Sequence, residues 1–212
     1  MTGRYNNHIK ELQGWNGLLS KWPDVDQSYN VAPGQSITAF RDTHGEPMRW
    51  GLIPSWAESF ESDYATHNAF IETIDSKPAF RSAWKKSQRC LIPMAGYYEW
   101  KGEKGNKQPY YVTDNFTGGL VAAGLYESWK LGKFLSCTII TKPADSAMSE
   151  LHNRAPILLT PETAHDWLSG TDNQNIEEIM RLNRPKLSFY KVGKIVGKTD
   201  VDNPSLIDPM RV

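Results

Sequence analysis

The second residue of the chain has the chemistry of a nucleophile. It is a threonine, in the opening Met1-Thr2-Gly3-Arg4. A small residue at position 2 allows Met1 to be removed after synthesis, which would leave Thr2 with a free α-amine beside its β-hydroxyl. Because an α-amine titrates at about pH 8, a usable fraction of it is neutral at pH 7. A neutral amine attacks aldehydes, so we expect residue 2 to capture a carbonyl group if Met1 is removed.

Two other residues have side chains suited to moving protons. Glu99 lies in the aromatic, apolar run Gly96-Tyr97-Tyr98-Glu99-Trp100, where a carboxylate needs a partner or a function. His152, in His152-Asn153-Arg154-Ala155-Pro156, has an unperturbed pKa near neutrality. Considered alone, His152 fits an ordinary loop better than a catalytic site, and Asn68 fits best as the N-cap of a short helix that begins at Ala69.

Five short motifs follow in a fixed order along the chain. They are Thr2-Gly3-Arg4, Tyr29-Asn30-Val31-Ala32-Pro33-Gly34, Trp50-Gly51-Leu52-Ile53-Pro54-Ser55-Trp56, Asn68-Ala69-Phe70-Ile71-Glu72-Thr73, and Gly96–Trp100 together with His152–Pro156. With these motifs, from residue 2 to about residue 160, the chain resembles the SRAP family of SOS-response-associated peptidases, or abasic-site processing proteins. The resemblance implies β-strands around a barrel-like core with flanking short helices, open to a basic DNA groove.

The resemblance also implies a role for individual residues. Family members use an N-terminal cysteine, exposed by removal of Met1, to cross-link to abasic sites in single-stranded DNA. It implies a catalytic group of Thr2 as nucleophile, Asn68 holding the sugar, Glu99 beside the amine, and His152 as proton donor to the sugar oxygen. It implies a DNA-binding set of Gly3, Arg4, Pro33, Trp56, Phe70, Arg81 and Arg154, with the arginines at positions 4 and 154 on phosphates and the tryptophan beside the lesion.

The sequence departs from the family pattern at two of these positions. Thr2 replaces the cysteine, and a hydroxyl is a far weaker nucleophile than a thiolate at neutral pH. We therefore expect a reversible imine, or strand cleavage by β-elimination, in place of a durable cross-link. Phe70 replaces an arginine, which removes one phosphate contact and provides a ring that can stack on a base.

Three alternatives remain open at this stage. The chain can be a non-covalent binder of damaged single-stranded DNA whose chemistry was lost with the cysteine. It can be an N-terminal nucleophile peptidase in which the amine of Thr2 activates its own hydroxyl. Thr2 can also be an engineered Cys-to-Thr substitution whose parent forms a stable DNA–protein cross-link.

The bulk properties fit one domain over residues 1–212, with an irregular tail from about residue 192. Lys and Arg balance Asp and Glu at 24 each, which argues against binding to polyanions by bulk charge but allows a local basic groove. We see no signal peptide and no transmembrane run. Two cysteines without CxxC spacing predict buried thiols in a cytoplasmic protein. We expect a monomer without metal or cofactor.

The elements that must position these residues are mostly strands. Strand-like runs are predicted at Cys90–Met94, Gly96–Trp100, Tyr110–Thr113, Leu120–Leu125, Phe134–Thr141 and Ala155–Leu159. Helices are predicted from Ser76 through Lys85, after the N-cap Thr160 with Pro161 in the first position, and over Asn175–Leu182. The fold class is α+β, with antiparallel hairpins curling into a β-rich, barrel-like core.

Overall fold

A closed ring of five strands forms the centre of the computed structural model, which describes residues 2–59, 65–103, 105–114, 116–130, 132–146, 148–170, 173–181 and 185–210. The ring runs β9-β3-β2-β5-β8 and returns to β9. Its strands are β2 (Ser36–Phe40), β3 (Gly45–Trp50), β5 (Arg89–Met94), β8 (Leu120–Trp129) and β9 (Phe134–Pro143). The β3–β9 pair is parallel and the other four pairs are antiparallel. The predicted barrel-like core is therefore confirmed.

Three short strands extend the ring. β4 (Asn68–Phe70) pairs in parallel with β9, β10 (Arg154–Pro156) pairs antiparallel with β9, and β11 (Leu158–Leu159) pairs antiparallel with β8. The strand predicted over Ala155–Leu159 is thus two strands, which pair with different neighbours. Two 3₁₀ turns, η1 (Ile71–Thr73) and η2 (Met148–Glu150), lie next to β4 and β10 in the chain.

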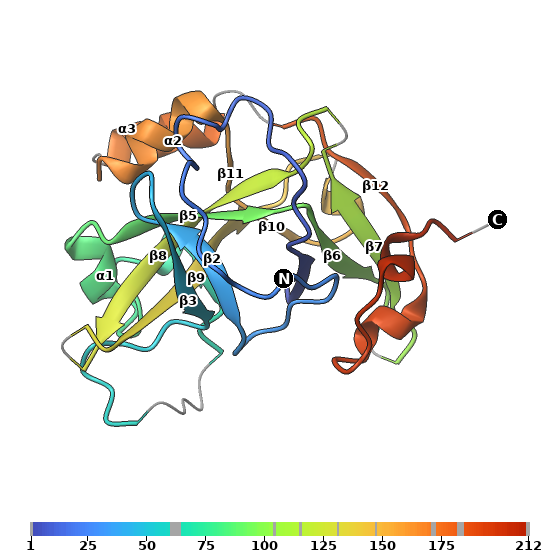
Figure 1. The fold of residues 1–212 in the computed structure, drawn as a ribbon, viewed down its shortest axis with the longest axis horizontal. Helices are drawn as coiled ribbons and strands as arrows, with labels where there is room; N and C mark the ends of the chain where they lie inside the picture. Colours follow the sequence, from blue (N-terminus) through green and yellow to red (C-terminus); the bar gives the residue numbers. More distant parts are fainter. Residues whose placement is uncertain are drawn as a thin grey trace.

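A second sheet stands beside the barrel (Figure 1). Its antiparallel order is β1 (Arg4–Asn6), β6 (Gly96–Lys101), β7 (Gln108–Thr113) and β12 (Ser188–Lys191). The segment after β12 contains two 3₁₀ turns, η3 (Lys194–Gly197) and η4 (Pro204–Ile207). Val196 and Leu206 from this segment pack on Tyr98 and Tyr111, so the end of the described chain covers one face of this sheet.

The alternation of side chains along the barrel strands creates two apolar faces. On one face Ile92 of β5 and Ile139 of β9 pack with Tyr97 of the second sheet. On the other face Leu91 and Val121 pack with residues of the helices. Because both faces are covered, β5 and most of β8 and β9 are buried, and this is why these three strands are recognisable in the sequence.

Helices α1 (Arg81–Lys85), α2 (Pro161–Leu168) and α3 (Asn173–Arg181) lie at one side of the barrel (Figure 1). α2 begins as predicted, with a capping box at Thr160. α1 is shorter than the helix predicted from Ser76, because the chain makes turns before Arg81. α3 matches the predicted helix, of which Leu182 lies outside the described residues.

Candidate active site beside residue 2

Thr2 lies at the entrance of β1, where the chain joins the second sheet. Arg4 pairs with Tyr98 of the neighbouring antiparallel strand β6. Thr2 is only 1% exposed, and its hydroxyl Oγ1 is buried without a hydrogen-bond partner among the described residues. A buried hydroxyl of this kind requires an explanation, because buried polar groups in folded proteins are nearly always hydrogen-bonded.

Asn68 holds the backbone of Thr2. It is the first residue of β4 and is buried, and its side-chain Nδ2 donates to the carbonyl oxygen of Thr2 at 2.6 Å. Pairing of Asn68 with Ile139 of β9 fixes its place on the sheet. Its Oδ1 is a second buried polar atom with no hydrogen-bond partner in the described part of the chain. Asn68 is therefore not a helix cap, because it is a strand residue whose amide points at residue 2.

Glu99 is a buried carboxylate on the strand next to Thr2. It follows Tyr98, the partner of Arg4, so continuing the antiparallel register by one residue places Glu99 beside Gly3. Its Oε1 accepts a hydrogen bond from the backbone N–H of Trp100 at 3.2 Å. The strand pairing thus brings a negative charge to the start of the chain.

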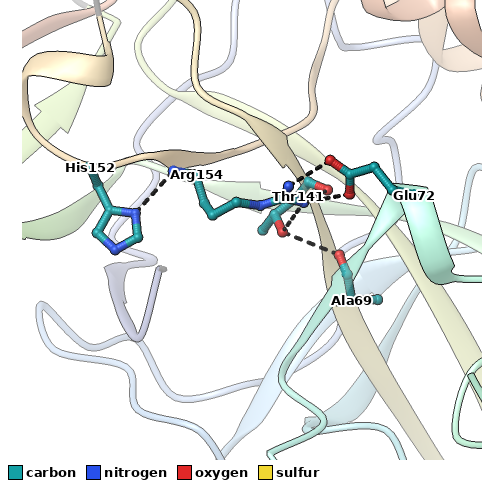
Figure 2. A network of polar contacts seen from close by, with 5 residues as sticks. All are labelled: Ala69, Glu72, Thr141, His152 and Arg154. Atoms are coloured by element: carbon teal, nitrogen blue, oxygen red, sulfur yellow. Dashed lines mark hydrogen bonds and ion pairs between the residues drawn. The ribbon is translucent and has the colours of Figure 1, made fainter.

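His152 follows η2 and is half-buried. The backbone N–H of Arg154 donates to its Nδ1 at 3.0 Å (Figure 2). Because an N–H group can only donate, Nδ1 carries no proton in this arrangement, and in the neutral imidazole the proton is on Nε2. Burial lowers the pKa of His152 below its ordinary value, while the charge of Glu99 opposes this effect. Glu99 and His152 are therefore close enough to influence each other electrostatically.

Arg154 connects His152 to β4 and η1 through its side chain. Its guanidinium donates to both carboxylate oxygens of Glu72, at 2.6 and 2.9 Å, and to the carbonyl of Thr141 at 2.7 Å (Figure 2). It also lies over the ring of Phe70, with Cζ 4.1 Å from the ring centroid. This bidentate pair lowers the pKa of Glu72. No short-range pattern in the sequence marks Glu72 and Thr141 as partners of a residue so far along the chain.

A family model described as SOS response associated peptidase (SRAP) matches residues 1–199. The chain belongs to the SRAP family. It is 34% identical over 192 residues to the abasic site processing protein YoqW of Bacillus subtilis (strain 168), covering 85% of each chain. It is 27% identical to the abasic site processing protein YedK of Escherichia coli (strain K12), covering 89% of this chain and 87% of YedK. A crystal structure of a protein from Bacteroides thetaiotaomicron superposes with a TM-score of 0.78 at 25% identity, covering 97% of this chain and 99% of that one.

The side chain of Arg4 in this SRAP chain is hydrogen-bonded to other parts of the protein. Its guanidinium donates to the side chain of Asn30 at 3.1 Å and to the carbonyls of Val196 and Gly197 at 3.3 and 3.4 Å. Partial burial lowers its pKa. Arg4 therefore links η3 to the start of β1 by hydrogen bonds. A phosphate contact at Arg4 stays a prediction.

The other predicted DNA-binding residues of the SRAP chain lie on its surface. Pro33 is exposed in the loop before β2, Arg81 is exposed at the start of α1, and Gly3 is half-buried beside Thr2. Trp56 is 60% exposed, and its indole N–H donates to the carbonyl of Pro78 at 3.4 Å. None of the described hydrogen bonds joins Pro33, Trp56 or Arg81 to the group around Thr2, so their part in DNA binding stays a prediction.

The described residues of the SRAP chain contain no group of three or more His, Cys, Asp or Glu arranged to hold a metal ion. Both cysteines, Cys90 and Cys137, are buried and free. Of the helices that the structure describes, none has both the length and the apolar character needed to cross a membrane.

Proposed function

We propose that this SRAP protein processes abasic sites in single-stranded DNA through the α-amine of Thr2, after removal of Met1. The relatives named as abasic site processing proteins support the substrate. The observation that carries the proposal is the pair of buried polar atoms, Thr2 Oγ1 and Asn68 Oδ1, that no described residue satisfies. Such atoms fit a site whose remaining hydrogen bonds are made to a ligand.

The reaction begins with opening of the sugar. An abasic deoxyribose is mostly a closed hemiacetal, and only the open form has an aldehyde at C1′. The Nε2–H of neutral His152 donates a hydrogen bond to the ring oxygen O4′ and stabilises the negative charge that develops there as the C1′–O4′ bond breaks. Solvent water takes the C1′ hydroxyl proton, and O4′ receives a proton from water. The lowered pKa of His152 suits this role, because the imidazole is neutral at pH 7, with Nδ1 accepting from Arg154 and Nε2–H left as the donor.

The amine of Thr2 then attacks C1′. A C–N bond forms, the carbonyl oxygen leaves as water, and a protonated imine results. Glu99 can take the proton that the amine carries as ammonium, and its negative charge stabilises the iminium that follows. Asn68 fixes the carbonyl of Thr2 and so orients the amine on the same residue. Positioning of this kind is a large part of catalysis for groups held in reacting geometry.

The hydroxyl of Thr2 makes the intermediate short-lived. Its addition to the imine gives an oxazolidine, which reopens more readily than the thiazolidine that a cysteine would close. From the open iminium, a base removes a C2′ proton, and the released electron pair forms a C1′–C2′ double bond while the imine π pair moves onto nitrogen. The nitrogen pair then re-forms the C1′–N double bond, the C1′–C2′ pair moves to form a C2′–C3′ double bond, and the C3′–O bond breaks to release the 3′ phosphate. The proposed activity is thus reversible capture with lyase-type cleavage, by a protein that we expect to act as a monomer.

The test is trapping of the imine. Intact mass first establishes that Met1 is absent, and the protein is then mixed with single-stranded DNA containing one abasic site, with and without borohydride. We expect an adduct only with borohydride, together with cleaved DNA. Undamaged DNA and a duplex of the same sequence serve as controls for the aldehyde and for strandedness. Binding without any trapped adduct would instead indicate a non-covalent binder, and turnover of a peptide amide would indicate a peptidase.

A further inference from the structure

Phe70 is an exposed aromatic residue close to the candidate site. It is 39% exposed and lies two residues after Asn68 on β4. Side chains two residues apart on a strand point to the same face, at a spacing of roughly 6.6 Å. Asn68 and Phe70 therefore emerge on one side of β4, the first toward Thr2 and the second toward solvent.

The ring of Phe70 is held in place from behind. The guanidinium of Arg154 covers one face of the ring at 4.1 Å from its centroid, and this side chain is only 12% exposed. Glu72 and the carbonyl of Thr141 in turn fix Arg154 by hydrogen bonds. The exposed part of the ring lies away from Arg154, so β4 presents a supported aromatic surface beside the site.

The charges around this surface favour a base over a phosphate. Glu72 neutralises Arg154 and is itself 43% exposed, so a phosphate approaching Phe70 would meet a carboxylate and an arginine already hydrogen-bonded. A nucleobase offers a flat π-face, and stacking on an aromatic side chain tolerates any base.

We infer that Phe70 stacks on the nucleobase adjacent to the abasic position. This inference rests on the proposed function, because it places the lesion at Thr2. The single ring supports one base, so the contact lies on only one side of the lesion. It makes recognition depend on an intact neighbouring nucleotide, and two consecutive abasic positions would lose the contact.

Binding measurements isolate this contact from the covalent step. Fluorescence anisotropy uses single-stranded DNA with a tetrahydrofuran abasic analogue, which has no aldehyde, and companion strands whose 5′ or 3′ neighbour is also replaced by the analogue. Phe70→Leu should weaken binding by roughly 5- to 150-fold on the strand with both neighbours present, as expected for loss of one stacked base. It should have no effect on one of the two strands that lack a neighbour. Phe70→Trp should retain binding.

Two controls separate stacking from other causes. Phe116→Leu changes an exposed phenylalanine on the turn between β7 and β8, and it should leave binding unchanged. Phe70→Arg should weaken binding to the intact-neighbour strand, whereas a phosphate contact predicts tighter, more salt-dependent binding that ignores the neighbour.

The failure of this inference differs from the failure of the proposed function. If the wild-type protein traps an imine but Phe70→Leu binds every strand as tightly as wild type, stacking is refuted and the proposed function stands. If the wild-type protein neither binds nor traps abasic DNA, the proposed function fails and the inference fails with it.

Discussion

Replacement of Thr2 by cysteine is the sharpest test of the proposed chemistry. Thr2→Cys exchanges a hydroxyl for a thiol at a residue that is 1% exposed, and both side chains are small enough for Met1 to be removed. A cysteine thiol titrates at about pH 8.5, so roughly a tenth of it is thiolate at pH 7.5. The hydroxyl provides almost no alkoxide at this pH. We therefore expect Thr2→Cys to close a stable ring and to form an adduct that survives heating without borohydride.

The effect of Thr2→Cys on stability follows from the environment of Oγ1. A buried hydroxyl without a partner costs about 1–3 kcal/mol, and a thiol, which behaves as a small apolar group, relieves this cost. Loss of the threonine methyl removes about 0.8 kcal/mol of apolar burial. The free energy of unfolding should thus rise by about 0–2 kcal/mol, which corresponds to an increase in Tm of about 0–8 °C. A change in adduct durability would then not come from unfolding.

The assay compares wild type and Thr2→Cys on denaturing gels after incubation with abasic single-stranded DNA, with intact mass and thermal melting of each protein. Thr2→Gly is the matched control, because it keeps the amine and has neither hydroxyl nor thiol. It should be trapped only with borohydride. The reasoning is wrong if Thr2→Cys, with Met1 absent and an unchanged fold, forms no heat-stable adduct, or if wild type forms one equally well.

Three further predictions concern the residues around Thr2. Asn68→Ala leaves the buried carbonyl of Thr2 without its 2.6 Å donor, which costs about 1–3 kcal/mol, and rapid-quench trapping should show a rate reduced by roughly 5- to 150-fold. The trapping rate should rise between pH 5 and 8, because the neutral fraction of the Thr2 amine rises with pH. His152→Ala should lower the trapping rate. Because the folded pKa of His152 is depressed, its contribution to stability is present above its unfolded pKa and lost as pH falls through the lower folded value. Glu72→Gln should cost under about 1 kcal/mol in chemical denaturation, since Glu72 is 43% exposed. The folded pKa of Glu72 is also depressed, so this difference from wild type should disappear as pH falls through that lowered value.

Three of the five barrel strands, β5, β8 and β9, could be predicted because they are apolar and covered on both faces. β5 is buried along its whole length, and its apolar run is visible in the sequence. β1, β2, β3, β4 and β12 were not predicted as strands. β3 begins Gly45-Glu46-Pro47, which resembles a turn, and β4 has three residues, too few to show an alternation. β3 is a strand because it pairs antiparallel with β2 and in parallel with β9, and β4 is a strand because it pairs in parallel with β9. A pattern within a short segment does not report such partners.

Arg89 shows the same limit for a charged residue. The sequence favours a solvated helix face for Lys85, Lys86 and Arg89, but Arg89 is buried at the start of β5. Its guanidinium lies over the rings of both Trp84 and Trp167, at 4.8 and 4.5 Å from their centroids. Burial lowers its pKa to about 10. Two tryptophans far apart in the chain create this site, so the local charge pattern was misleading.

The candidate site shows a similar division. Resemblance to a family selects Thr2, Asn68, Glu99 and His152. In the structure the β1–β6 pairing places Glu99 beside Gly3, and a hydrogen bond joins Asn68 on β4 to Thr2. The sequence does not reveal that Arg154 is engaged by Glu72, because that pair spans 82 residues. This ion pair bears on the inferred role of Phe70. If Arg154 were free to bind a phosphate, Phe70 would have no part in DNA binding. Because Glu72 fixes Arg154 instead, Arg154 supports one face of the Phe70 ring, and the ring can act as a stacking surface.

The way Thr2 is held has a consequence for the proposed reaction. Its carbonyl is bound by Asn68, and the chain beyond it enters β1 through the pairing of Arg4 with Tyr98. These contacts hold residue 2 through its carbonyl group and the residues that follow it. They do not engage its amine, which is the group that attacks the sugar in the proposed reaction. Under the proposed function, removal of Met1 therefore creates the amine and frees the side of Thr2 from which a sugar can reach it, while the contacts that orient the residue stay in place.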